Sequence, residues 1–157
     1  MNEDEIWMKI AISEACQAAS EDEVPVGAIL VKNGFIIAQG HNQSISKSDP
    51  TAHAEIQAIR KAAKNLKNYR LTETTIYVTL EPSAMCLGAI MHARVGRIVF
   101  GAYDTKTGVC GSCGDLKDAN FFQHQLQITG GVVEKKCRMI LKDFFQKKRK
   151  EKNILST

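Results

Sequence analysis

The chain has 157 residues, of which 44% are hydrophobic and 24% are charged, a balance typical of a soluble globular domain. Its apolar runs are only a few residues long, so we expect no membrane-spanning helix. The first residues are acidic where a secretory signal would be basic, and the five cysteines form an odd set. We therefore expect a cytoplasmic protein in which residues 1–157 form a single domain and the thiols are free or bind metal.

Positive charge is concentrated in residues 134–152, which carry nine lysines and arginines against three acidic residues. This segment has a net charge of +6, whereas the rest of the chain has −2. A basic end on an acidic body suggests an anionic partner such as a nucleic acid. A solubilising terminal helix explains the same charges, so charge alone leaves both interpretations open.

Helical and strand patterns alternate along the chain, judged by apolar spacing, β-branched composition and turn signals such as Asn33-Gly34. In order, they predict a helix over 5–19, strands over 26–31 and 35–38, a helix over 52–64, a strand over 74–80, a helix over 83–92, strands over 97–102 and 127–129, and a helix from 133 to about 149. Residues 103–125 are predicted to be mostly irregular. This order predicts a mixed sheet with helices on both faces.

Three residues of the predicted helices are assigned to the core or to an apolar stripe from their position on a helical face. Cys16 and Cys137 are interpreted as core residues, with Phe144 on the same apolar stripe as Cys137. Adjacent residues on a helix point about 100° apart, so Phe145 is expected to be freer than Phe144. A Cys-x-x-Cys pair at positions 110 and 113 lacks a second pair or a thioredoxin-like context, and we interpret it as incidental.

Two short segments with chemically versatile side chains fall at predicted helix starts. Residues 51–55 are Thr-Ala-His-Ala-Glu, and residues 81–86 are Glu-Pro-Ser-Ala-Met-Cys. Two helix N-termini that meet create a positive field, which favours a thiolate and a metal-bound hydroxide. Taken singly, His53 fits a capping or core histidine and Glu55 a first-turn glutamate. The two segments together resemble the zinc nucleobase deaminase signature, which is His-x-Glu followed about thirty residues later by Pro-Cys-x-x-Cys.

The chain as a whole resembles the bacterial tRNA-specific adenosine deaminases from about residue 5 to residue 150. The matching segments, in the same order, are residues 23–28, 49–55, 77–82, 88–94, 99–102 and 143–145, followed by the basic tail. The resemblance implies an α/β fold of the cytidine deaminase-like type, a three-layer α/β/α sandwich with a mixed sheet, and a homodimer. It also implies hydrolytic deamination of the wobble adenosine to inosine in a tRNA anticodon stem-loop.

The same resemblance assigns roles to individual residues. It implies one Zn²⁺ per subunit, held by His53, Cys86 and the residue at position 83, with Glu55 as the catalytic proton carrier. In such a site the metal lowers the pKa of bound water to about 7. The residues implied to contact the nucleoside or the RNA are Asn42, Asp104, Lys106, Phe145, Lys148 and Arg149.

Ser83 departs from the family pattern, because it stands where the first cysteine of Pro-Cys-x-x-Cys belongs. A neutral hydroxyl is a poor zinc ligand, so we expect reduced zinc occupancy and impaired activity in this chain. A laboratory substitution is favoured, because the rest of the motif is intact. A natural change in a chain that has lost deamination and a thiolate supplied by a distant cysteine stay open, and serine is also a good helix N-cap.

Two other functions remain as alternatives. A deaminase of a free base or nucleoside, such as guanine or cytosine, would need the same zinc chemistry but no basic helix. If the chain is instead a tRNA-binding protein without catalytic activity, Ser83 is explained by the loss of deamination, although the retained Glu55 weighs against this alternative.

Overall fold

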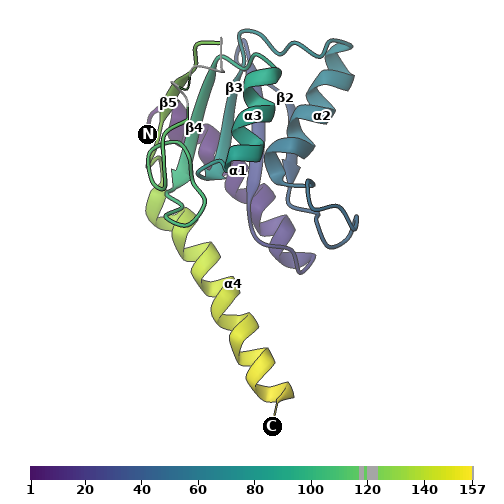
Figure 1. Ribbon diagram of the computed structural model, residues 1–157, viewed down its shortest axis with the longest axis vertical. Coiled ribbons are helices and arrows are strands. Elements are labelled where there is room, and N and C mark those ends of the chain that lie inside the picture. The colour runs from purple at the N-terminus through teal and green to yellow at the C-terminus, as the bar shows by residue number, and fades with distance from the viewer. Residues whose placement is uncertain (117–118, 120–123, 157) are drawn as a thin grey trace.

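The computed structural model describes residues 1–116, 119 and 124–156. Within these residues the chain forms a five-stranded sheet and four helices (Figure 1). The elements in chain order are α1 (Glu3–Ser20), β1 (Gly27–Lys32), β2 (Phe35–His41), α2 (Ala54–Leu66), β3 (Thr75–Leu80), α3 (Ala84–His92), β4 (Arg97–Ala102), β5 (Gln127–Thr129) and α4 (Glu134–Leu155). None of the described helices is both long and apolar enough to cross a membrane.

The sheet has the strand order β2-β1-β3-β4-β5 and is mixed, as predicted. Strand β1 runs antiparallel to β2 and β3, whereas the β3–β4 and β4–β5 pairs are parallel. The predicted hairpin between β1 and β2 is confirmed: Asn33 and Gly34 both have positive φ, at 51° and 77°. Positive φ at both central residues is what a tight turn between twisted strands requires.

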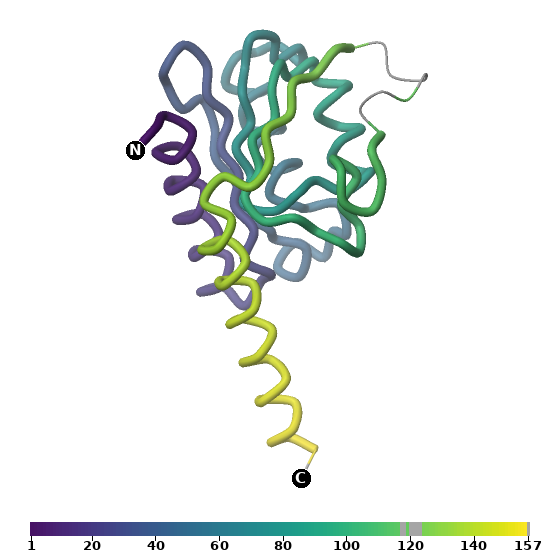
Figure 2. The backbone as a smooth tube through the Cα atoms, turned by 90° about the vertical axis from the view of Figure 1, so that its left-hand side faces the viewer, coloured from purple at the N-terminus to yellow at the C-terminus, as the bar shows by residue number. Residues whose placement is uncertain are grey.

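Two apolar clusters cover the two faces of the sheet, because side chains alternate along each strand. Leu30 of β1 and Phe100 of β4 pack towards α2 and α3, in a cluster that includes Ala58 and Ile90. The intervening residues, such as Ile29, face the other way. They pack against α1 and α4, in a second cluster that contains Met8, Ile12, Tyr77, Val99 and Cys137. Figure 2 shows the sheet between these helix pairs, so the predicted three-layer α/β/α sandwich is confirmed.

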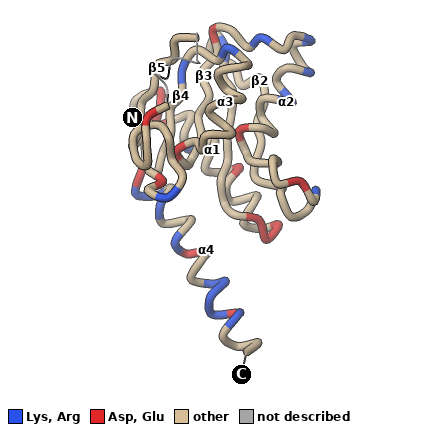
Figure 3. The backbone as a smooth tube through the Cα atoms, viewed as in Figure 1, with Lys and Arg blue, Asp and Glu red and all other residues tan. Residues whose placement is uncertain are grey.

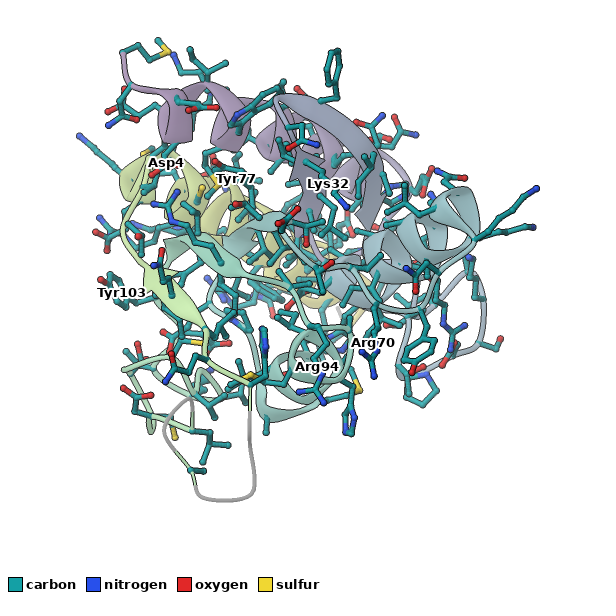
Figure 4. All side chains as sticks on the ribbon, turned by 90° about the horizontal axis from the view of Figure 1, so that it is seen from above. Asp4, Lys32, Arg70, Tyr77, Arg94 and Tyr103 are labelled. Atoms are coloured by element: carbon teal, nitrogen blue, oxygen red, sulfur yellow. The ribbon has the colours of Figure 1, made fainter. Side chains whose placement is uncertain are left out.

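An ion pair ties the start of α1 to the sheet. Asp4 accepts hydrogen bonds from both terminal nitrogens of Arg97, at 2.9 and 2.7 Å, and from the Tyr77 hydroxyl at 3.0 Å. Figure 4 labels Asp4 and Tyr77. Arg97 also donates to the Thr129 hydroxyl at 3.0 Å. The hydrogen bond from Arg97 is the largest influence on Asp4 and lowers the pKa of its carboxyl group. One cluster of polar side chains thus joins α1, β3, β4 and β5.

Two predicted boundaries and one burial assignment are wrong. Strand β2 continues to His41, because Gly40 lies against the backbone of α2, where an added Cβ would come within 2.8 Å of the Ala58 nitrogen. Helix α4 continues to Leu155, since no glycine or proline follows position 149 to end it. Cys16 is exposed, whereas Cys137 is buried as expected. The buried stripe of α1 includes Ala15, and its neighbour Cys16 is turned away from the core.

Helix α4 leaves the body of the molecule and carries its positive charge outward. Its first turns pack on the sheet through Cys137, while lysines and arginines recur along the projecting part (Figure 3). Phe144 is half-buried and Phe145 is 43% exposed, so the predicted difference between them is confirmed. The helix therefore presents a basic surface with an aromatic side chain at the edge of the body.

Candidate active site

The N-termini of α2 and α3 meet beyond the end of β3, as the sequence predicted. His53 is the residue that precedes α2, and Ser83 precedes α3. The two ends are close enough that His53 Nδ1 lies 3.6 Å from Cys86 Sγ in the first turn of α3. Clefts outside the carboxyl ends of strands are the usual place for ligands in α/β sheets.

Ser83 acts as the N-cap of α3. Its hydroxyl accepts a long hydrogen bond, 3.5 Å, from the backbone nitrogen of Cys86. Proline at position 82 is buried just before it, which fixes the direction in which the chain enters the helix. The capping interpretation of Ser83 is therefore confirmed.

Glu55 and Cys86 are buried beside one another. Glu55 is 4% exposed and Cys86 is fully buried. Burial is the main reason that the pKa of Glu55 is raised. Burial, followed by the nearby Glu55 carboxylate, likewise raises the pKa of the Cys86 thiol. Both positions thus favour the protonated form, and Glu55 is a buried carboxyl able to hold a proton at this place.

A pocket of about 270 Å³ opens at this point of the fold. Its lining residues are Val24, Val26, Asn42, Ser44, His53, Glu55, Leu80, Glu81, Ser83, Asp104 and Thr107. Asn42 is oriented by the backbone nitrogen of Ala54, which donates to Asn42 Oδ1 at 2.8 Å. The structure therefore brings Asn42, His53, Glu55, Ser83 and Asp104 to one pocket, with Cys86 in contact with His53.

The remaining candidate residues lie outside this pocket. Lys106 is exposed in the loop after β4, and Arg149 is exposed on α4. Lys148 is half-buried, contacts the Asp22 carboxylate, and lies 3.6 Å from a Glu151 oxygen. The hydrogen bond to Asp22 is the largest reason that the pKa of Lys148 is raised. Lys148 is thus already engaged with carboxylates in the structure.

Three polar pocket residues were given no role by the sequence analysis: Ser44, Glu81 and Thr107. Glu81 is 2% exposed, although it directly follows a strand of apolar and β-branched residues. The sequence placed it first in the segment 81–86, and an acidic residue at the end of a buried strand was the further signal for a role. Ser44 and Thr107 sit in loops whose path the sequence does not define.

The donor atoms at this point fall one thiolate short of a catalytic zinc site. His53 offers an imidazole nitrogen and Cys86 a thiol, but Ser83 offers only a neutral hydroxyl that already caps α3. Across the described part of the chain, no three His, Cys, Asp or Glu side chains are grouped so as to hold a metal ion. Catalytic zinc sites take three nitrogen, thiolate or carboxylate ligands from the protein. The side chains present therefore do not fit a tightly held zinc ion.

The family model of the MafB19-like deaminases matches residues 1–149. The tRNA-specific adenosine deaminase of Haemophilus influenzae is 51% identical over 96% of this chain and 88% of its own length. The enzyme of the same name from Bacillus subtilis is 45% identical, over 97% and 94%. The chain belongs to the tRNA-specific adenosine deaminases, within the MafB19-like deaminase family.

Solved structures agree with this family assignment. A structure from a study of A-to-I editing by tRNA:A34 deaminases has a TM-score of 0.84 and 40% identity, over 87% of this chain and 99% of that one. A guanine deaminase from Bacillus subtilis has a TM-score of 0.63 and 42% identity, over 71% of each chain. The cytidine deaminase-like fold expected from the sequence is confirmed.

Proposed function

We propose that this protein is a hydrolytic adenosine deaminase that converts the wobble adenosine of a tRNA anticodon loop to inosine. The observation that carries the proposal is that His53 and Glu55 line one pocket, with Cys86 Sγ 3.6 Å from His53 Nδ1, in a chain 51% identical to a tRNA-specific adenosine deaminase. An anticodon loop suits such a pocket, because its bases are already single-stranded and a base that leaves the stack costs little.

Different residues of the pocket bind the substrate and transfer protons. Asn42 and Asp104 stand at the pocket and position the flipped nucleoside. Glu55, buried in the first turn of α2, carries the proton from the attacking water to the purine ring and then to the departing ammonia. Lys106, Phe145, Lys148 and Arg149 lie along the RNA, where stacking and phosphate contacts give affinity.

The metal site is the weak part of this enzyme. We assign His53, Ser83 and Cys86 to the Zn²⁺ that the family uses, and the Ser83 hydroxyl leaves the ion poorly held. Changes beyond the direct ligands already cost about 10–100-fold in metal affinity or activity, so the loss of a direct thiolate costs at least that. The chain as it stands is therefore an impaired deaminase.

The test is inosine formation in an adenosine-containing anticodon stem-loop, measured for the protein and for Ser83→Cys. We expect Ser83→Cys to deaminate at least about 10–100-fold faster. Ser83→Ala keeps the position small without adding a thiolate, and Ser83→Cys combined with Glu55→Gln removes the proton carrier; neither is expected to gain activity. An inactive Ser83→Cys protein that still binds the RNA would point instead to a tRNA-binding protein without catalysis.

A second candidate is a free-base deaminase, which the 42% identity to a guanine deaminase structure favours. The basic end of α4 separates the two functions, because a small substrate needs no such surface. Deletion of residues 146–157 from Ser83→Cys is expected to abolish inosine formation in RNA. Deamination of guanine or cytosine that survives this deletion, with no activity on RNA before it, would favour the second candidate.

The same proposal includes a homodimer in which residues 1–157 of each subunit form one domain. The two apolar clusters that back onto a common sheet support a single cooperative unit. Sedimentation velocity and thermal unfolding check both points. We expect one species of twice the chain mass and one unfolding transition, and a monomer or two separate transitions would contradict them.

A further inference from the structure

A single buried carboxylate holds the loop that follows β4. Glu81 accepts hydrogen bonds at Oε1 from the backbone nitrogen of Asp104, at 3.0 Å, and from the Ser112 hydroxyl. Its Oε2 accepts from the backbone nitrogens of Cys110 and Ser112, at 2.9 and 3.1 Å. All four donors belong to residues 104–112, so one side chain is bonded to both ends of this loop.

The loop is closely fitted around the Glu81 carboxylate. A Cβ added to Gly108 would lie 2.4 Å from Glu81 Cδ, so only glycine permits this approach. Asp104 in turn caps the first turn of the loop, accepting from the backbone nitrogens of Lys106 and Thr107 at 3.0 and 3.2 Å. The turn is thus stabilised within itself, and Glu81 attaches it to the end of β3.

Glu81 also lies beside the candidate active site. Its backbone nitrogen donates to Ala102 O at 2.8 Å, and the next residue, Pro82, accepts from Val109 N at 3.1 Å. Ser83 follows immediately. Glu81, Asp104 and Thr107 line the same pocket. A displacement of the loop would therefore move Asp104 and Thr107 relative to the helix that carries Ser83.

We propose that Glu81 is a positioning residue that fixes residues 104–112 at the pocket and thereby sets the affinity for the substrate nucleotide. The proposal rests on the proposed function for the identity of that nucleotide. Glu81 acts through the loop and does not exchange protons with the substrate, because its two oxygens are occupied by loop donors. Its loss affects KM more than kcat.

The test compares the protein with Glu81→Gln. The glutamine side chain has an NH₂ group in place of one acceptor oxygen, and this group cannot accept hydrogen bonds from the backbone nitrogens of the loop. We expect amide hydrogen exchange in residues 104–112 to become about tenfold faster, with no change in α2. The affinity for an anticodon stem-loop RNA falls about three- to tenfold. In the Ser83→Cys background, KM rises by a similar factor and kcat changes less. Glu73→Gln is the matched control, because Glu73 is exposed before β3, at the opposite end of the strand.

Ser112→Ala provides a second, milder variant that removes one hydroxyl donor and is expected to give a smaller change in the same direction. Unchanged exchange in the 104–112 segment of folded Glu81→Gln would overturn the proposal, as would a loosened loop with unchanged RNA affinity and unchanged KM. If neither the protein nor the variant bound the RNA, the proposed function would fail, and the exchange rates would still decide whether Glu81 holds the loop.

Discussion

Glu23 and Glu81 are buried carboxylates that hold two different loops of the candidate pocket. Glu23 accepts hydrogen bonds from the backbone nitrogens of Ile45 and Ser46, at 3.0 and 2.8 Å. The neighbouring Ser44 lines the pocket. Both carboxylates satisfy backbone groups that no strand or helix pairs, so both loops keep a defined path without regular secondary structure.

The protonation of Glu23 makes this arrangement sensitive to pH. Burial on its own would raise the pKa of Glu23, but the hydrogen bonds from Ser46 and Ile45 outweigh it and leave the pKa below its ordinary value of 4.5. The folded state thus favours the ionised form. Its contribution to stability is complete above about pH 4.5 and is lost as the pH falls through the lowered pKa of the folded state.

Glu23→Gln is therefore expected to reduce the free energy of unfolding by about 1–3 kcal/mol at pH 7, and by less at pH 3. Urea denaturation at both pH values measures the difference, with Glu73→Gln as the exposed control. Equal stability of Glu23→Gln and the protein at pH 7 would contradict this account, as would a difference of the same size at pH 3.

At the residue scale, the sequence predicted the functional side chains that belong to short motifs of characteristic spacing. His53, Glu55 and Cys86 belong to two local motifs, and the folded chain brings His53 and Glu55 to one pocket with Cys86 in contact with His53. Glu81 could not be predicted in the same way. Its hydrogen-bond donors lie 23 to 31 residues later in the chain and meet it only after the β4 loop has folded back.

The bounds of helices and strands were predicted well where a residue type, such as proline or a capping serine, begins or ends the element. Proline and Ser83 start α3 as expected, and β4 and β5 have the predicted bounds. The end of β2 could not be predicted, because Gly40 and its neighbours form a strand through contact with α2 and pairing with β1. Helix α4 exceeded its predicted length since its last residues contain no stop signal.

Two glycines illustrate how closely these elements pack. A Cβ at Gly27 in β1 would lie 2.1 Å from the carbonyl oxygen of Ala11 in α1, whereas a Cβ at Gly88 in α3 meets nothing within 4 Å. We expect Gly27→Ala to lower the free energy of unfolding by at least about 2 kcal/mol, because α1 must move away from the sheet.

Gly88→Ala is the matched variant and is expected to raise the free energy of unfolding by about 0.5–1 kcal/mol, since alanine loses less backbone entropy in a helix. Chemical denaturation of both variants measures these opposite changes. A neutral Gly27→Ala variant would show that α1 does not approach β1 as closely as the structure indicates.

At the scale of the whole molecule, the layered fold separates the pocket from the charge that would attract RNA. The pocket lies at the N-termini of α2 and α3. The basic residues extend outward along α4, which projects from the body (Figures 1 and 3). The sequence located this charge correctly, but it did not show that Lys148 contacts Asp22. That contact joins α4 to the end of α1 and partly neutralises Lys148.

Arg149 and Lys148 are therefore expected to differ in their contribution to RNA binding, although they are adjacent. Arg149→Ala should weaken binding of the anticodon stem-loop and reduce the slope of log affinity against log salt concentration by about 0.7. Lys148→Ala should reduce the slope by less, because Asp22 and Glu151 already balance its charge. Fluorescence anisotropy over a series of salt concentrations measures both slopes. A larger effect of Lys148→Ala would contradict this distinction.

The central claim is that this chain is a tRNA adenosine deaminase whose zinc site is weakened by Ser83. Zinc per chain, measured by elemental analysis on the protein and on Ser83→Cys after the same dialysis against zinc, tests it most directly. We predict close to one zinc per chain in Ser83→Cys and well under one in the protein. A full zinc in the protein itself would contradict the account, because another ligand would then have to complete the site with His53 and Cys86.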